Sequence, residues 1–190
     1  MTDPGVASYE RFLHGDDGGF EDIVRAYREG LILFILGYVG DAFAAEDISQ
    51  DVFVKLYVKR PKFRPDASFK TWLYTIAKRE AQNYIKKRRR ERGTDEGIPD
   101  DGDEGTEDAV SELVGDERRR ALHRALSELN DDYRAVLYLL YFEYMTPREA
   151  SSVMGRSPRQ IHDLIYRAKS SLRAVIERGG EKYEILRDIY

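Results

Sequence analysis

The 190-residue sequence contains no cysteine, which excludes disulfide bonds, thiolate metal sites and a cysteine nucleophile. Histidine is also scarce: His14, His123 and His162 lie far apart, and no two of them have the i, i+4 spacing of a helical zinc site. The sequence has no glycine-rich phosphate loop after a strand pattern, and no serine or lysine has an evident base beside it. These absences argue against an enzyme, and no metal or other cofactor is expected.

Long apolar runs are absent too. The longest one, residues 31–36, continues only to Val39, which is well short of the roughly 20 residues needed to cross a bilayer. Residues 1–14 include Asp3 and Glu10 and lack the apolar centre of a secretion signal. A cytoplasmic protein is therefore expected.

Charge is abundant and unevenly distributed. Charged residues make up 35% of the chain, yet the formal net charge is only −4. Residues 93–117 hold eleven Asp or Glu and no Lys or Arg, so the remaining 165 residues carry +7. This acidic segment is rich in Gly and has few large apolar groups, so it cannot bury enough surface to offset chain entropy. We predict a flexible acidic linker that would let two basic modules sit well apart on one partner.

Apolar residues at helical spacing predict a bundle of three helices over residues 1–92. The first predicted helix spans residues 20–38. The second begins near residue 44 and ends at residues 61–65, and the third spans residues 68–90. The first helix ends at Gly40 and Asp41, and Ser68 is the expected N-cap of the third helix. Ile32, Leu33 and Leu36 lie opposite the main apolar stripe of the first helix, so this part of the helix is apolar on all sides. We expect residues 6–13 to cover them, with a partner-protein surface as the alternative.

Residues 118–178 predict a second helical domain that contains a helix-turn-helix. Thr146 and Glu149 frame a capping box with proline at the first helical position, and Ser157 and Gln160 repeat the arrangement eleven residues later. Gly155 between them is placed to end the first of these helices in a left-handed conformation. A short helix, a turn with glycine and a longer helix are typical of this motif. Beyond it, apolar residues in the tail, 179–190, are compatible with a short amphipathic helix of unassigned purpose.

The second helix of this motif has the side chains of a major-groove reader. Arg159 would pair with guanine and Gln160 with adenine, while Arg167 and Lys169 would neutralise phosphates. Asp163 on the same face suits only a base-amino contact, such as one to cytosine. The alternative is a solvated helix in an ordinary bundle.

Aromatic and basic residues alternate along the third helix, a combination suited to single-stranded nucleic acid. Phe69 and Trp72 lie on the buried stripe, so core packing is expected for them. Tyr74, Lys78 and Arg79 are expected to point away from that stripe and are better candidates for binding.

Two further polar surfaces have alternative interpretations. Residues 86–90 are five consecutive cations, which indicate phosphate contacts or, alternatively, a solvated helix end. The polar face of the second helix is either solvated or a protein-docking face; its residues are Glu46, Asp47, Gln50, Asp51 and Lys55.

Two blocks of this sequence resemble bacterial sigma factors of the extracytoplasmic-function group. Residues 45–53, which read AEDISQDVF, together with residues 68–78, which read SFKTWLYTIAK, are similar to region two of that group. Residues 126–173, from LSEL to YRAKSSLR, resemble region four. The resemblance implies an all-α fold of two small domains, at 1–92 and 118–178, joined by the linker. It also implies a dissociable promoter-recognition subunit whose partners are core RNA polymerase, promoter DNA and an anti-sigma factor.

The same resemblance implies three sites. The expected core-polymerase contacts are Asp47, Gln50 and Asp51. The expected residues at the minus-10 element, together with the neighbouring basic run, are Lys70, Thr71, Tyr74, Lys78, Arg79, Asn83, Lys86, Lys87 and Arg88. The expected readers of the minus-35 element are Ser157, Arg159, Gln160, His162, Asp163, Tyr166, Arg167 and Lys169. The alternatives are a stand-alone helix-turn-helix regulator that binds duplex operator DNA, and a protein-interaction adaptor with no DNA role.

Overall fold

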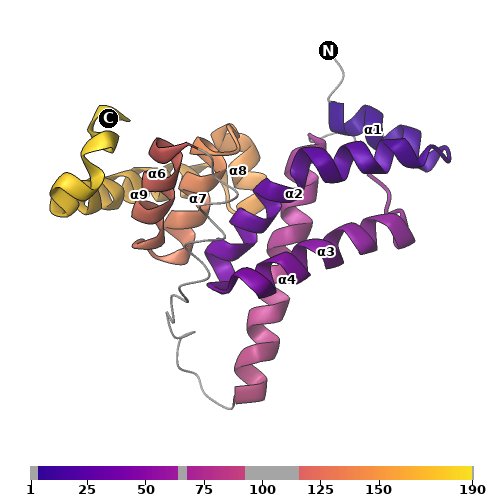
Figure 1. Ribbon diagram of the computed structural model, residues 1–190, viewed down its shortest axis with the longest axis horizontal. Helices are drawn as coiled ribbons and strands as arrows, with labels where there is room; N and C mark the ends of the chain where they lie inside the picture. The colour runs from indigo at the N-terminus through magenta and orange to yellow at the C-terminus, as the bar shows by residue number, and fades with distance from the viewer. Residues whose placement is uncertain (1–3, 64–67, 93–115, 190) are drawn as a thin grey trace.

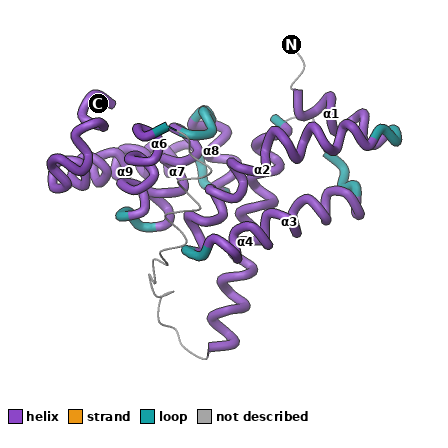
Figure 2. Tube along the Cα trace, in the orientation of Figure 1, coloured by secondary structure: helices purple, strands orange, loops and turns teal. Residues whose placement is uncertain are grey.

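The computed structural model describes residues 4–63, 68–92 and 116–189, and the regular elements in these ranges are all helices. The first half contains α1 (Pro4–Leu13), α2 (Asp17–Val39), α3 (Ala42–Lys59) and α4 (Phe69–Arg92). The second half contains α6 (Glu117–Ser127), α7 (Asp131–Tyr141), α8 (Pro147–Met154), α9 (Pro158–Gly179) and the 3₁₀ segment η1 (Gly180–Ile189). Figures 1 and 2 show this arrangement, which confirms the predicted all-α fold. The predicted linker lies outside the described residues, except for Asp116 and Glu117 at the start of α6.

The helix ends in the first half follow local signals in the sequence. Gly40 adopts a left-handed φ of 70° and ends α2, and the Asp41 side chain then accepts a hydrogen bond from Ala44 N at 3.1 Å. The Ser68 hydroxyl accepts from Thr71 N at 3.2 Å at the start of α4, as predicted. Each cap satisfies a backbone group that the helix itself leaves without a partner.

Helix α1 closes an aromatic cluster in the first half. The Tyr9 ring lies 5.4 Å from Phe69 and 5.5 Å from Trp72, and its hydroxyl donates to the Pro61 carbonyl at 2.7 Å. Phe12 packs against Phe20 at 5.2 Å. The expected packing role of Phe69 and Trp72 is therefore confirmed.

The cover predicted for α2 was wrong for Leu33. A 10-residue helix is about 15 Å long, so α1 spans less than half of the 23-residue α2. Leu33 instead lines a small cavity with His123 and Leu126 of α6 and Ala135 of α7. The second half of the chain thus buries this side of α2.

The two halves pack against each other along α2 and α4. Figure 1 shows α7 and α8 beside these helices. Arg134 of α7 donates to the Gly37 carbonyl of α2 at 2.6 Å, and Lys70 of α4 pairs with Glu143 in the turn after α7. We call this contact region the seam. The C-terminal end of α4 projects beyond the neighbouring described helices (Figure 1).

The helix-turn-helix forms as predicted. Both capping boxes are complete, with side-chain and backbone bonds in each direction at Thr146 and Glu149 and at Ser157 and Gln160. Gly155 has φ 64° and ends α8. After α9 the tail forms η1, whose Tyr183 and Leu186 are buried; this segment packs on α6 and α9.

Candidate nucleic-acid and polymerase interfaces

Helix α9 separates a buried stripe from an exposed reading face. Ile161, Leu164, Ala168 and Leu172 are buried and anchor the helix to the rest of the second half. The predicted minus-35 residues are all exposed: Ser157, Arg159, Gln160, His162, Asp163, Tyr166, Arg167 and Lys169. The structure therefore brings these eight residues together on one accessible helix.

The capping box restricts one of these readers. Gln160 Oε1 accepts a hydrogen bond from Ser157 N at 2.9 Å, while Ser157 Oγ accepts from Gln160 N at 3.3 Å. A bidentate contact with adenine uses both the oxygen and the nitrogen of a glutamine amide. Gln160 must therefore give up its capping bond to read adenine, whereas neither Arg159 nor Tyr166 contributes to this cap. Tyr166 is 78% exposed.

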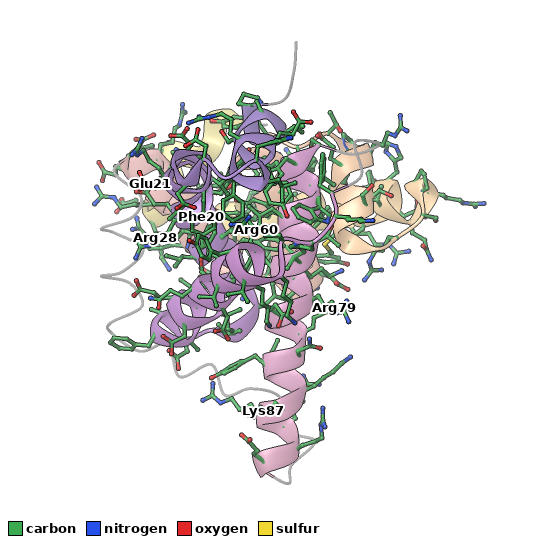
Figure 3. All side chains as sticks on the ribbon, turned by 90° about the vertical axis from the view of Figure 1, so that its right-hand side faces the viewer. Phe20, Glu21, Arg28, Arg60, Arg79 and Lys87 are labelled. Carbon is green, nitrogen blue, oxygen red and sulfur yellow. The ribbon has the colours of Figure 1, made fainter. Side chains whose placement is uncertain are left out.

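The predicted minus-10 residues of α4 divide into two groups. One group lies along the seam at helical spacing, and its members are Lys70, Thr71, Tyr74 and Lys78. The other group lies further along α4: Arg79, Asn83, Lys86 and Lys87 are exposed, and Arg88 is partly buried. Figure 3 shows Arg79 and Lys87 on α4, with Lys87 on its projecting part. The sequence predicted one site for all nine residues, but the structure exposes four residues of the second group and none of the first.

Tyr74 contradicts the predicted orientation. Its side chain is 0% exposed, and its ring lies 5.2 Å from that of Phe34 on α2. Burial, reinforced by the nearby Glu143 carboxylate, raises the pKa of the Tyr74 hydroxyl well above 10. The prediction failed because α2 and the second half of the chain cover the face of α4 that sequence periodicity left unassigned.

The two seam lysines donate to the second half of the chain. Lys70 Nζ lies 2.6 Å from a Glu143 carboxylate oxygen and donates to the Glu143 carbonyl at 2.8 Å. Lys78 Nζ donates to the Met154 carbonyl at the end of α8 at 2.6 Å. Partial burial lowers the pKa of Lys78. Of the three residues expected to point away from the core, only Arg79 is exposed.

The polar face of α3 is accessible where polymerase docking was predicted. Asp47, Gln50 and Asp51 are exposed. The flanking residues of the same face are engaged within the first half, since Glu46 pairs with Arg28 and Lys55 pairs with Glu80. The three predicted docking residues thus lie between two ion pairs that fix α3 against α2 and α4.

An apolar groove beside this face was missed from the sequence. It has a volume of about 350 Å³ and runs between α2 and α3, where Phe20, Val24, Gln50 and Phe53 contribute to its lining. Val54 and Val58 complete one edge. They are 57% and 71% exposed. Their spacing of four residues on a helical face away from the core was the available signal, because exposed apolar side chains at helical spacing indicate a docking surface.

Other kinds of site find no support in the described part of the chain. None of its helices combines the length and the apolar character needed to cross a membrane. Its His, Asp and Glu residues form no group of three or more arranged to hold a metal ion. The described candidate surfaces are therefore the reading face of α9, the two groups on α4, and the docking face and groove of α3.

Both halves of the chain match families of known proteins. A family model described as Sigma-70 region 2 matches residues 23–91, and one described as Sigma-70, region 4 matches residues 119–172. The chain is 31% identical over 171 residues to the RNA polymerase sigma-H factor of Pseudomonas aeruginosa, covering 86% of this chain and 89% of that protein. It is 26% identical over 159 residues to the ECF RNA polymerase sigma factor SigM of Bacillus subtilis, covering 84% and 96%.

A solved structure has a similar fold. It is the sigma factor RpoE of Bartonella quintana in complex with the anti-sigma factor NepR, and the likeness has a TM-score of 0.64 at 22% sequence identity. It covers 83% of this chain and 96% of that one.

Proposed function

The chain belongs to the extracytoplasmic-function group of the sigma-70 family, and we propose that it directs core RNA polymerase to promoters through surfaces on α3, α4 and α9. As a sigma factor it acts in promoter-specific initiation of transcription. We assign region two to residues 1–92 and region four to residues 118–178, with 93–117 as the connecting linker and 179–190 as a tail. The observation that supports this most strongly is that a match to region two and a match to region four occur in one chain, and that the region-four match includes the exposed, basic reading face of α9.

Docking on core polymerase is assigned to α3. Asp47, Gln50 and Asp51 supply polar contacts, and the groove edged by Val54 and Val58 adds apolar area beside them. Interfaces that hold firmly have an apolar centre with a polar rim, and this face offers both.

Opening of the minus-10 element is assigned to α4. The exposed cations Arg79, Lys86 and Lys87 would follow the phosphates of the non-template strand, with Asn83 beside them and Arg88 partly buried. Lys70, Thr71, Tyr74 and Lys78 belong to the same proposed site but face the seam in the packed arrangement.

Reading of the minus-35 element is assigned to α9. Arg159 and Tyr166 would meet base edges in the major groove, and Arg167 and Lys169 would meet phosphates. Duplex recognition by one helix and single-strand capture by another explain why one chain needs two domains.

The proposed partners are core RNA polymerase, promoter DNA and an anti-sigma factor. The solved sigma factor of similar fold is bound to an anti-sigma factor, which supports the last of these for this chain. Sigma factors are generally regulators of initiation rather than enzymes, and we propose that this chain does no chemistry itself and acts in the cytoplasm beside the polymerase. A stand-alone regulator of duplex operators is not favoured, because the chain matches the family model of region two in addition to that of region four.

Run-off transcription with core polymerase tests this function. Initiation from a set of selected promoter fragments is expected to depend strictly on the chain. The control is the same core polymerase without the chain. Tight duplex binding by the chain alone, with no effect on initiation, would instead support the stand-alone regulator.

A further inference from the structure

The seam face of α4 combines residues proposed for DNA with contacts to the second half of the chain. We propose that this face has two alternative partners, the second half of the same chain and single-stranded DNA, so that the packed arrangement is an inactive, closed state. The proposal rests on the function assigned to α4 above. It names a regulation of that site that is built into the chain and needs no second protein.

Both cationic side chains of the seam face are already in use. Lys70 donates to the carboxylate and the carbonyl of Glu143, and Lys78 donates to the Met154 carbonyl. These bonds direct both ammonium groups toward the second half of the chain. A DNA phosphate at these positions would compete with the same bonds, so phosphate contact favours an open seam.

The two remaining seam residues are inaccessible. Thr71 is 2% exposed and Tyr74 is 0% exposed, so neither is available to an unpaired base. The Tyr74 hydroxyl is buried beside the Glu143 carboxylate, so the same acidic residue faces both Tyr74 and Lys70. Stacking of an unpaired base on Tyr74 therefore requires Glu143 to move away.

The acceptor side of the seam depends on a single turn. Glu143 is 10% exposed in its side chain, and the next residue, Tyr144, has the left-handed φ of 53° that bulky residues rarely adopt. This turn directs both oxygen groups of Glu143 toward Lys70. Glu143 lies outside the proposed DNA and polymerase surfaces, so its substitution tests the seam separately from those surfaces.

The Ser68 hydroxyl also donates across the seam, to Glu149 Oε1 at 3.1 Å. Two further polar bonds across the seam end on backbone carbonyls that water can also satisfy. Arg134 donates to the Gly37 carbonyl at 2.6 Å, and Tyr138 donates to the Gly30 carbonyl at 3.2 Å. Separation exchanges these bonds for bonds to water at modest net cost. Docking of each half on polymerase would supply the driving force.

The first experiment measures binding of the free chain to a fluorescent single-stranded DNA. Glu143→Gln is expected to bind about tenfold more tightly than wild type, because the closed state loses a charge-assisted hydrogen bond. Glu21→Gln is the matched control, since it makes the same charge change on an exposed residue of α2 (Figure 3). Its affinity is expected to change less than about twofold, as one charge remote from the seam contributes little. Equal effects of the two substitutions would overturn the proposal.

The second experiment traps the closed state in a chain that has no cysteine of its own. A Cβ atom added at Gly37 would lie 3.8 Å from Arg134 Cγ and 3.3 Å from its Cδ, so the two positions face each other across the seam, and oxidation of Gly37→Cys with Arg134→Cys probes their proximity. The oxidised double variant is expected to lose run-off transcription, and reductant is expected to restore it to the level of the Arg134→Cys variant. The two single variants, unchanged by oxidation, are the controls.

The outcomes of this experiment separate the two claims. Failure of the disulfide to form in the free double variant, or full transcription by the oxidised form, would overturn the closed state alone. Absence of promoter-specific transcription with the wild-type chain would overturn the proposed function itself.

Discussion

Lys70 and Glu143 are 73 residues apart in the sequence, yet Lys70 Nζ lies 2.6 Å from the Glu143 carboxylate and 2.8 Å from its carbonyl. One residue belongs to the proposed DNA surface of region two and the other to the turn before the helix-turn-helix of region four. The bond between them ties the accessibility of one site to the position of the other domain.

Arg159 is expected to carry promoter specificity. Arg159→Ala should weaken binding of the polymerase complex to its promoter fragment by about 1–3 kcal/mol, because an arginine at the N-terminal turn of a reading helix pairs with guanine. Arg173→Ala, on the same helix but beyond the predicted readers, is the control and should stay near wild type. Equal losses from both would assign α9 only a general electrostatic role.

Gln50 and Asp51 are expected to contribute to polymerase binding. Replacing both with Ala should lower the affinity for core polymerase by more than about 1 kcal/mol, as loss of central interface residues does. Thermal stability should be unchanged, because both side chains are exposed. Glu21→Ala on α2 is the control. Unchanged affinity in a pull-down titration with purified core polymerase would remove the docking assignment.

The basic end of α4 is expected to contact phosphates. Replacing Lys86, Lys87 and Arg88 with Ala should flatten the plot of log affinity for single-stranded DNA against log salt, by about 0.7 for each phosphate that the variant no longer neutralises. Arg25→Ala, an exposed cation on α2, should leave the slope unchanged. An identical slope for the triple variant would show that these cations are merely solvated.

His123 is expected to make folding sensitive to mild acid. Desolvation, aided by the charge of Arg134, lowers its pKa from 6.5 to about 4. The unfolded chain therefore takes up a proton between pH 6.5 and pH 4 that the folded chain does not bind, so stability falls as pH drops through this window. The expected loss is about 2–3 kcal/mol in urea unfolding.

Two substitutions check this assignment to one histidine. His123→Phe should remove most of the pH dependence, because the ring contacts with Tyr138 and Phe142 can be kept. His162→Phe, at an exposed position on α9, should leave the dependence intact. A retained slope in the first variant would assign the proton uptake elsewhere.

Local signals predicted α2, α3, α4 and the helix-turn-helix with their ends, but the prediction of three helices over residues 1–92 missed α1. The capping pairs Thr146 with Glu149 and Ser157 with Gln160 act within one turn, so their geometry is encoded by neighbouring residues alone. Gly40 and Gly155 ended their helices for the same reason. The exposed reading face of α9 followed directly from these boundaries and from the helical period.

Contacts between distant segments were beyond such reasoning. Tyr74 looked solvent-facing because its cover comes from α2 and from the second half of the chain, and no periodicity within α4 reveals that cover. Leu33 was assigned to the wrong neighbour on the same grounds. Val54 and Val58 were detectable, but only once their positions were judged against the stripe that α3 buries.

The projecting end of α4 carries five consecutive cations, residues 86–90, and those that are three or four residues apart lie on the same side of the helix and repel one another. Lys87 finds only Glu91 as an acidic neighbour on the same helix, at 3.9 Å. Binding of a polyanion along this end would therefore neutralise its charge and also stabilise the last turns of the helix. The heat released on capture of a single strand should accordingly include a coil-to-helix contribution, visible by calorimetry as a steeper dependence on temperature than rigid docking would give.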